Sequence, residues 1–478
     1  MGIGVSGWTL ARAVSSQGQL GVVSGSALDT VVARRLQCGD LDGSIRRALS
    51  RFPWPEMAQR VLDAYFIPGG KARDAAFTLS PMADLDLSQT YTDLVIVANY
   101  VEVFLAKEGH DGMVGINYME KVQLPTLPSL LGSMLAGVDA VLMGAGIPLA
   151  IPGILDGLAS WETVSLRLQV ENATSEEQHS LSFNPRQVAA GPYPTLDRPA
   201  FLAVVSSDVV AKSLIRKSSG SVQGFVIENH EAGGHNAPPR SRQQVEGSPD
   251  REYGSKDIPD LAKIRSLNRP FWLAGGYASP ARLAEARDVG AEGIQVGTAF
   301  AFCTESGILG WIKKEVIRRH FKGTLNVLTD FQASPTGFPF KLIQLFPSPK
   351  QATSLRKRIC DLGHLRRLYS QTRDQIGFRC PSEPVAAFVA KGGRQAETIG
   401  KRCLCNGLLA TIGLGQPGDK AHESPLVTAG EDFSFLSQIL DPGQESYSVK
   451  DVLGYLLGRC QRNLNGLGMQ VSLEAAGL

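Results

Sequence analysis

The residues of this sequence best suited to chemistry lie in Glu231-Ala232-Gly233-Gly234-His235, directly after the apolar run 222–227. A short apolar run that leads into two glycines and a histidine is typical of a buried strand ending at a site. Glycine has no Cβ, so Gly233 and Gly234 let the backbone approach a flat or anionic ligand closely. His235 has the side chain whose ordinary pKa lies near neutrality, which suits proton transfer. The alternative is a turn followed by a histidine of the core or the surface.

Two later segments have glycine where a phosphate site would need it. Ala274-Gly275-Gly276-Tyr277 and Gln295-Val296-Gly297-Thr298 each end an apolar run and precede a helical pattern. In α/β barrels, the loops after strands seven and eight often bind phosphate through backbone N–H groups at a helix N-terminus. For either motif alone, a tight turn between strand and helix is the alternative. The sequence has no G-x-x-x-x-G-K-[ST] motif, which excludes a nucleotide-hydrolysing P-loop.

The elements that must position these residues form a repeating pattern over residues 1–320. Short apolar runs alternate with helical patterns, which predicts parallel βα units. Together with the start of the chain, the strand candidates number eight, so we expect a TIM-type (β/α)8 barrel, with an open doubly wound sheet as the alternative. The runs are 20–23, 113–117, 140–143, 201–205, 222–227, 271–274 and 293–296, and the helical patterns are 8–17, 29–37, 53–66, 94–107, 124–136, 148–159, 208–217, 261–267 and 280–289.

Two parts of the chain depart from this pattern. Residues 165–170 and 180–183 alternate polar and apolar side chains, which predicts a small two-stranded excursion at about 162–198. From about residue 320 the βα pattern ends, so we expect a barrel domain over 1–320 and a C-terminal extension or cap over 321–478. The polar loop 236–256 has the length of a lid or substrate loop. The Pro/Gly-rich segment 334–341 is expected to pack over the barrel mouth.

The composition limits the classes of function. The chain has 478 residues, 43% of them hydrophobic and 20% charged, as in an ordinary globular protein. Its formal net charge of +2 gives no reason to expect nucleic acid or an anionic membrane as a partner. No apolar run has the roughly 18 residues of a membrane helix, and the first residues lack the regions of a signal peptide. We therefore expect no nucleic-acid partner, no membrane partner and a cytoplasmic protein.

Four of the seven cysteines lie close together in the C-terminal part. They are Cys360, Cys380, Cys403 and Cys405. Four thiolates can bind zinc or an iron–sulfur cluster, but this spacing differs from the usual C-x2-C pairs. The sequence therefore predicts no metal, with these four residues as the candidates for a metal site and free or buried thiols as the alternative.

The glycine-histidine segment and the two glycine turns, in this order and spacing, resemble the nitronate monooxygenase family, formerly called 2-nitropropane dioxygenases. The resemblance covers roughly the first two-thirds of the chain. The family comprises FMN-dependent barrels. Related flavoproteins share the motifs, namely FMN-containing enoyl-acyl-carrier-protein reductases and the trans-acting enoyl reductases of polyunsaturated fatty-acid and polyketide synthases. The resemblance implies that FMN is the cofactor.

The resemblance also assigns roles to residues. Gly233 would let the backbone pass close to FMN, Asn117 would contact the flavin, and His235 would be the catalytic histidine. The FMN phosphate would be held by the two glycine turns, that is by Gly275, Gly276, Gln295, Val296, Gly297 and Thr298.

The sequence departs from the family at two places. Glu228 stands where the family usually has glutamine; its carboxylate would accept a hydrogen bond from a ring N–H but disfavour an anionic reduced flavin. Met1-Gly2 stands at the turn that normally follows a full strand, so we expect the first barrel strand to be short or absent.

The expected function is that of an FMN-dependent monooxygenase that oxidises alkyl nitronates with O2. His235 would take or position a proton, or stabilise the anionic substrate. The alternative is an FMN-dependent enoyl reductase acting on carrier-bound acyl chains, which would need NAD(P)H. An alternative of another class is a non-catalytic flavin- or metal-binding subunit. The substrate is thus a small molecule or a carrier-bound group, and the sequence specifies no oligomeric state.

Overall fold

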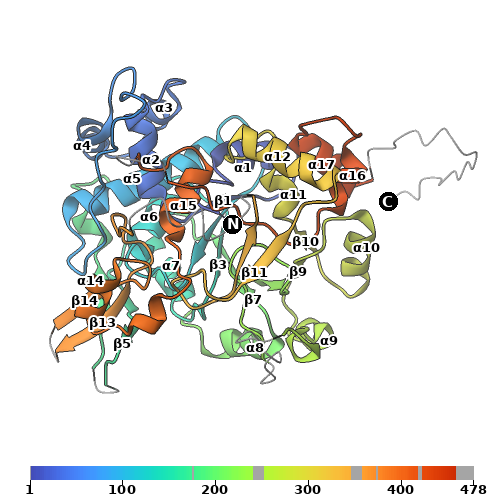
Figure 1. Ribbon diagram of the computed structural model, residues 1–478. Coiled ribbons are helices and arrows are strands. Elements are labelled where there is room, and N and C mark those ends of the chain that lie inside the picture. The colour runs from blue at the N-terminus through green and yellow to red at the C-terminus, as the bar shows by residue number, and fades with distance from the viewer. Residues whose placement is uncertain are drawn as a thin grey trace, which may run out of the picture.

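The computed structural model describes residues 2–174, 177–240, 252–345, 358–372, 375–417 and 423–458. Its centre is a parallel sheet whose strands lie side by side in the order in which they occur in the sequence (Figure 1). This order confirms the TIM-type fold. In the described residues the sheet has seven strands, and β1 and β10 are its two edges. No described strand lies between these edges and closes the barrel, so the expected eighth strand is not among the described residues. The strands are β1 (Gly21–Ser24), β2 (Val114–Met119), β3 (Ala140–Gly144), β7 (Ala200–Val205), β8 (Gly224–Glu228), β9 (Phe271–Ala274) and β10 (Gly293–Gln295).

Helices connect these strands and cover the outside of the sheet (Figure 1). The connection from β1 to β2 is the longest and contains four helices, of which α5 packs against α6. The helices of this part are α1 (Trp8–Ser15), α2 (Leu28–Gln37), α3 (Ser44–Leu49), α4 (Pro55–Tyr65), α5 (Gln89–Lys107), α6 (Thr126–Leu135), α7 (Ile151–Ala159), α8 (Asp208–Lys217), α9 (Leu261–Arg265), α10 (Pro280–Asp288), α11 (Thr298–Ala301) and α12 (Gly310–Phe321).

Both faces of the sheet are apolar, as a sheet covered on both sides requires. Side chains alternate along each strand, so Val141 and Phe225 pack beneath the helices while Leu142 and Val226 form a separate small core inside the barrel. Among the strand residues whose side chains point into the barrel, the polar ones therefore lie only at the strand ends, where the interior opens.

The excursion near 162–198 is joined to the C-terminal part of the chain. β4 (Val164–Arg167) pairs antiparallel with β6 (Ser180–Phe183), whereas β5 (Val170–Glu171) pairs parallel with β13 (Arg367–Thr372). The expected strand 165–170 is thus split, because Gln169 turns its backbone N–H to the side chain of Gln123, 2.7 Å away. Segments about 200 residues apart in sequence form one three-stranded sheet, β14-β13-β5.

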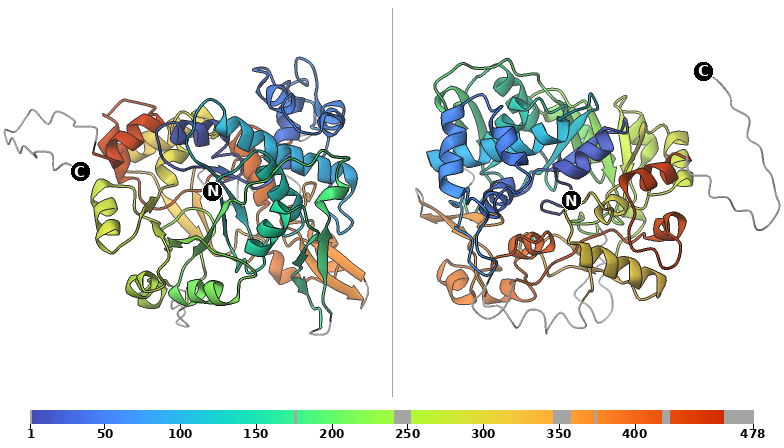
Figure 2. Two further views of the ribbon diagram at one scale, coloured as in Figure 1. Left: turned by 180° about the vertical axis from the view of Figure 1, so that it is seen from behind. Right: turned by 90° about the horizontal axis from the view of Figure 1, so that it is seen from above.

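The chain after residue 320 contributes short strands and helices that pack against the barrel. In both views of Figure 2, α12 (yellow) lies with α16 and α17 (red), and these elements share one hydrophobic cluster. A domain boundary at 320 stays a prediction. The elements are β11 (Val327–Asp330), β12 (Phe340–Ile343), β13, β14 (Gln375–Arg379), α14 (Val385–Ala390), α15 (Leu404–Thr411), α16 (Ser434–Ile439) and α17 (Val449–Leu456).

Two expectations from the sequence fall partly outside the described residues. Of the loop 236–256, residues 241–251 are not described, so its role as a lid stays a prediction. Of the extension 321–478, the described part ends at residue 458. Among the helices of the described ranges, none combines the length and the apolar character needed to cross a membrane.

Gly132 sets the approach of α6 to α5, and α6 begins at the site described below. A Cβ added at Gly132 would lie 2.3 Å from the backbone oxygen of Ile96, so Gly132→Ala must push the two helices apart. We expect a loss of about 2 kcal/mol in the free energy of unfolding, from overpacking partly offset by the better helix propensity of alanine. Urea denaturation measures it.

Gly310→Ala is the matched control, because a Cβ at Gly310, also in a helix, would meet nothing within 4 Å. We expect this variant to be as stable as the parent or slightly more so. Equal stability of the two variants would contradict the close helix contact at Gly132.

Candidate functional site

Residues at the carboxyl ends of the strands surround a cavity of about 140 Å³, called the inner cavity from here on. Six of the residues singled out in the sequence line it: Asn117, Glu228, Gly233, Gly234, His235 and Cys405. The ends of β1 and β3 contribute further wall. The cavity is covered by residues from elsewhere in the chain, namely Ile3, Phe340, His364, Leu365, Leu404, Cys405 and Leu408.

Asn117 and Glu228 reach the inner cavity because of the alternation of side chains along a strand. In β8, Phe225 and Ile227 pack against the outer helices, so Val226 and Glu228 point to the interior. The same alternation in β2 sends its odd-numbered residue Asn117 inward. Each strand therefore ends with a hydrogen-bonding side chain directed at the same space.

Glu228 occupies an apolar environment for a carboxyl group. Burial raises its pKa to about 7, because removal from water disfavours the charged form. Near neutral pH the carboxyl is then protonated in a large fraction of the molecules. The protonated form carries no charge and can donate a hydrogen bond. A protonated Glu228 would therefore not repel an anionic reduced flavin in the way that the sequence led us to expect of its carboxylate.

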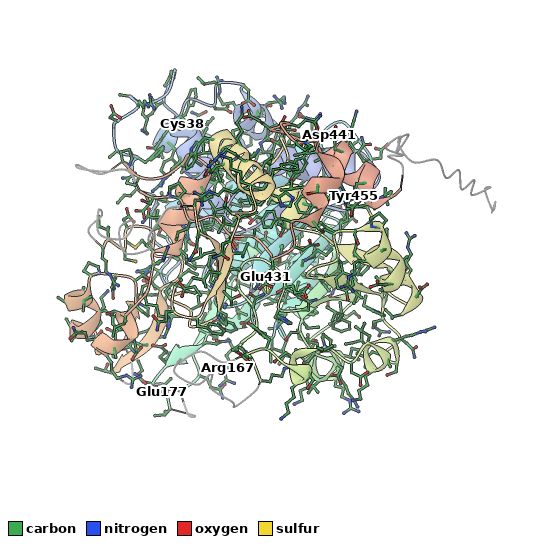
Figure 3. All side chains as sticks on the ribbon, turned by 45° about the vertical axis from the view of Figure 1, so that its right-hand side comes forward. Cys38, Arg167, Glu177, Glu431, Asp441 and Tyr455 are labelled. Atoms are coloured by element: carbon green, nitrogen blue, oxygen red, sulfur yellow. The ribbon has the colours of Figure 1, made fainter. Side chains whose placement is uncertain are left out.

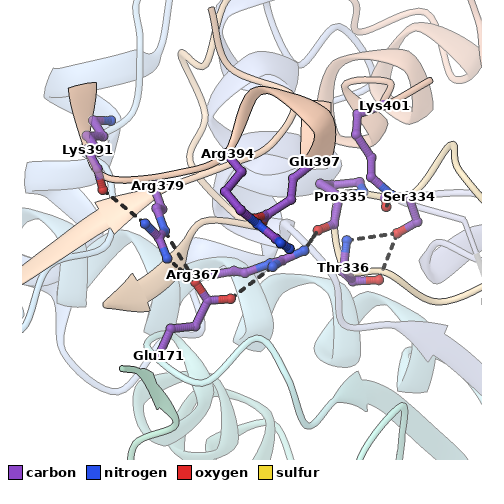
Figure 4. A network of polar contacts seen from close by, with 10 residues as sticks. All are labelled: Glu171, Ser334, Pro335, Thr336, Arg367, Arg379, Lys391, Arg394, Glu397 and Lys401. Carbon is purple, nitrogen blue, oxygen red and sulfur yellow. Dashed lines mark hydrogen bonds and ion pairs between the residues drawn. The ribbon is translucent and has the colours of Figure 1, made fainter. Parts of the chain in front are cut away.

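His235 is fixed by contacts with the segment that follows β11. Its Nε2 lies 2.7 Å from Ser334 Oγ, which lies 2.7 Å from Thr336 Oγ1. Figure 4 shows the Ser334–Thr336 part of this chain of hydrogen bonds. The ring of His235 meets the ring of Phe340 edge to face, with centroids 4.8 Å apart.

The backbone on either side of His235 is also paired with this segment. His235 and Phe340 form an isolated antiparallel bridge. The N–H of Lys341 donates to the carbonyl of Gly234 at 3.0 Å, and the N–H of Asn236 donates to the carbonyl of Pro339 at 3.0 Å. The expectation that residues 334–341 pack over the mouth therefore agrees with their observed position.

The environment of His235 keeps its imidazole neutral. Burial lowers the pKa of His235 to about 3, and the nearby charge of Lys121 lowers it as well. A neutral imidazole has one N–H donor and one acceptor nitrogen. It can therefore pass a proton only if it receives one at its other nitrogen, which is the position facing Ser334.

The residues expected to hold a phosphate lie beside the inner cavity and do not line it. They are Gly275, Gly276, Gln295, Val296, Gly297 and Thr298, at the ends of β9 and β10 and the start of α11. Gly275 and Gly276 have φ angles of +91° and +68°, a left-handed turn that favours glycine. Thr298 Oγ1 accepts a hydrogen bond of 2.8 Å from the N–H of Gly430.

The donor set fits a flavin better than a metal or a nucleotide triphosphate. The inner cavity offers glycine backbone at Gly233, an amide at Asn117 and a protonatable carboxyl at Glu228, groups that match the hydrogen-bonding edge of a flat heteroaromatic ring. A ligand with a phosphate tail would extend from there along the ends of β8, β9 and β10. Backbone N–H groups would hold that phosphate, although the Glu231 side chain lies against Gly276.

A second and larger cavity, of about 430 Å³, adjoins the inner one and is called the outer cavity. The two share the wall residues Val122, Pro125, His364 and Leu365. Thr336, the end of the hydrogen-bond chain from His235, lines the outer cavity. The chain Thr336–Ser334–His235 thus runs from one cavity to the other.

The sequence patterns do not single out three further residues of the site, Ser334, Thr336 and Lys121. Ser334 and Thr336 lie in the segment expected to cover the mouth, and no local pattern in the sequence assigns a role to their hydroxyl groups. Lys121 comes two residues after β2 ends at Met119, where a functional side chain of a barrel is commonly found. That position was the available signal for Lys121.

The four C-terminal cysteines lie around one void of about 10 Å³. Cys360 is close to Cys380 and Cys403 is close to Cys405, and Cys405 also lines the inner cavity. Cys38, by contrast, is exposed at the edge of the molecule (Figure 3). Within the described ranges, no three or more His, Cys, Asp or Glu side chains are arranged to hold a metal ion.

No family model and no curated protein matches the chain. Solved structures do match. FabK from Thermotoga maritima has a TM-score of 0.37 at 18% identity, over 73% of this chain and 71% of that one. A nitroalkane oxidase from Streptomyces ansochromogenes has a TM-score of 0.38 at 15% identity, over 72% and 74%. The enoyl reductase domain of MlnA from Bacillus amyloliquefaciens has a TM-score of 0.40 at 12% identity, over 76% and 84%.

The low pKa of His235 makes a signed prediction for stability. The folded-state pKa of about 3 lies below the ordinary value of 6.5, so the unfolded chain takes up a proton first as the pH falls. We expect neutral His235 to make its full contribution to the free energy of unfolding above pH 6.5. As the pH falls to about 4.5, the free energy of unfolding should decrease by about 2 to 3 kcal/mol.

His235→Asn should remove this part of the pH dependence in urea denaturation at the two pH values. In the parent protein, the NMR resonances of the His235 ring should not titrate between pH 5 and 8. A midpoint near 6.5 for these resonances would contradict the burial of the ring.

Proposed function

We propose that this chain is an FMN-dependent oxidoreductase that reduces the double bond of an α,β-unsaturated thioester. The observation that carries the proposal is the hydrogen-bond chain from Thr336 through Ser334 to His235. Reduction of a carbon–carbon double bond consumes one proton at carbon in every turnover, so the site needs a donor and a route of resupply. Oxidation of a nitronate anion needs no proton delivered to carbon.

The cofactor would lie in the inner cavity. When bound, FMN would supply the electrons for the reduction. Asn117 and Glu228 would hold its ring edge, and the glycine turns after β9 and β10 would hold its phosphate. The tight packing of residues 334–341 over the mouth keeps water away from the reacting atoms.

His235 would donate the proton. Thr336 N–H donates to Ser334 Oγ at 3.2 Å, which orients the Ser334 hydroxyl so that its proton can point to His235 Nε2. In this arrangement Nε2 is the acceptor and Nδ1 carries the ring proton. As Nδ1 gives its proton to the substrate, Nε2 takes one from Ser334, and Thr336 replaces it from the outer cavity. After product release, Nδ1 takes up a proton and Nε2 returns one to Ser334, which restores the starting tautomer for the next turnover. The imidazole then need not become a stable cation, which agrees with its low pKa.

The size of the outer cavity supports a long substrate. A volume of about 430 Å³ next to an inner cavity of about 140 Å³ provides room for an acyl arm behind the reacting group. We propose a small thioester or a carrier-bound acyl chain as substrate and NAD(P)H as the source of reducing power. The proposal involves no nucleic acid or membrane and places the protein in the cytoplasm.

A second candidate is the oxidation of alkyl nitronates with O2. The specific observation that favours it is the ammonium group of Lys121, which is close enough to His235 to lower the pKa of that histidine. A buried cation whose charge acts on a neutral imidazole suits a small anion such as a nitronate.

An assay pair separates the two. Under anaerobic conditions we expect NAD(P)H oxidation that depends on an enoyl thioester, and under air we expect no appreciable nitronate oxidation. Turnover of a nitronate without NAD(P)H, together with no thioester reduction, would overturn the first candidate in favour of the second. No turnover of either, with flavin bound, would favour a non-catalytic subunit.

His235→Asn should lower kcat by about 10²- to 10⁴-fold, the usual contribution of a positioned general acid. Ser334→Ala should lower kcat without changing flavin content, because it breaks only the route of resupply. The matched controls are His320→Asn and Ser437→Ala, since His320 Nε2 and Ser437 Oγ form the same contact at 2.7 Å elsewhere in the chain. Full activity of the Ser334→Ala variant would rule out the relay.

A further inference from the structure

The outer cavity has an excess of positive charge. Lys121, Arg366 and Arg367 line it, together with one acidic residue, Glu171. A cavity of this kind attracts anions, provided that its cations are not already neutralised within the protein.

Glu171 is fully engaged by arginines. Figure 4 shows its carboxylate between the guanidinium groups of Arg367 and Arg379. Arg367 Nη1 donates to Oε1 at 2.9 Å, and Arg379 Nη2 donates to Oε2 at 2.9 Å. Glu171 therefore neutralises Arg367 or Arg379 and leaves no charge for Lys121 and Arg366.

Arg366 is held by uncharged groups. Its Nη2 donates to the carbonyl of Ala83 at 2.6 Å, and its guanidinium lies 4.6 Å from the centre of the Phe378 ring. Among the described residues it has no carboxylate partner. These contacts fix the orientation of Arg366 but leave its charge uncompensated.

Lys121 is the least satisfied of the three. Its Nζ is shielded from solvent and has no hydrogen-bond partner among the residues that the structure describes. It lies 3.4 Å from the centre of the Phe338 ring, a cation–π contact. Burial lowers the pKa of Lys121 to about 7, with Arg367 acting in the same direction and Glu120 in the opposite one. An ammonium group with three unused donors is costly to bury unless something binds it.

We propose that the outer cavity binds a phosphate group of the substrate arm, with Lys121 as its charged hydrogen-bond donor and Arg366 nearby. This inference rests on the proposed function and extends it, because it defines the chemical class of the substrate tail. The shared wall with the inner cavity lets the reacting end of the same molecule lie near His235. The Phe338 ring covers Nζ of Lys121, so a phosphate in this cavity would contact Nζ after the ring turns aside.

Calorimetric titration tests the inference by binding alone. The two probes are 4′-phosphopantetheine and pantetheine, which differ by one phosphate. We expect the phosphate to improve the affinity of the parent protein about tenfold, as one charge-assisted hydrogen bond would. Lys121→Met should abolish that difference, and Lys121→Arg should retain part of it.

The matched control is Lys212→Met, because Lys212 is an exposed lysine of α8 on the barrel exterior. It should keep the tenfold difference. Thermal unfolding of the Lys121→Met variant verifies that it folds, which we expect because the change removes an unpaired charge. Equal affinity of the parent protein for the two probes, or an undiminished difference in Lys121→Met, would overturn the inference.

The assay of thioester reduction distinguishes this failure from failure of the proposed function. If the phosphate-dependent affinity is present and no thioester is reduced, the anion site stands and the reaction is wrong. If thioesters are reduced with no phosphate-dependent affinity, the reaction stands and the anion site is wrong.

Discussion

The site depends on one short antiparallel pairing, between residues 234–236 after β8 and residues 339–341 at the start of β12. Two backbone hydrogen bonds and the His235–Phe340 bridge make this contact. This contact places Phe340 over the cavity at the carboxyl ends of the strands. With it, a segment about a hundred residues further along the chain becomes the roof of the inner cavity and brings Ser334 to His235.

The shielding from water has the same electrostatic effect on His235, Lys121 and Glu228. The pKa of His235 falls to about 3, that of Lys121 falls to about 7, and that of Glu228 rises to about 7. Each shift favours the neutral form, because a charged group loses more hydration free energy on burial than it gains from interactions with neighbouring groups. Near neutral pH, Glu228 and Lys121 therefore each populate both protonation states, whereas His235 stays neutral. The site thus contains an ammonium group that an incoming anion would restore to full charge.

Much of the barrel could be read from the sequence because its signals are local. The apolar runs marked the strands of the sheet, and Asn117, Glu228 and His235 were found at strand ends because a strand end follows from a few adjacent residues. The partners of these residues could not be found in this way. His235 and Ser334 are 99 positions apart, and β5 pairs with β13 across nearly two hundred. Such contacts depend on which surfaces meet in the folded chain, and no local periodicity records them. The gathering of four irregularly spaced cysteines is of the same kind.

Titration of the flavin-free protein with FMN, followed by flavin fluorescence and absorbance, tests the central claim most directly. The account predicts saturation at one FMN per chain, with a changed flavin spectrum as the ring leaves water for the inner cavity. It also predicts weaker binding after Gly233→Val, because a Cβ at Gly233 would lie 2.7 Å from the backbone of Ala429 and Gly430 and displace that segment. A protein that folds, as judged by cooperative unfolding, but neither carries nor binds FMN would contradict the account.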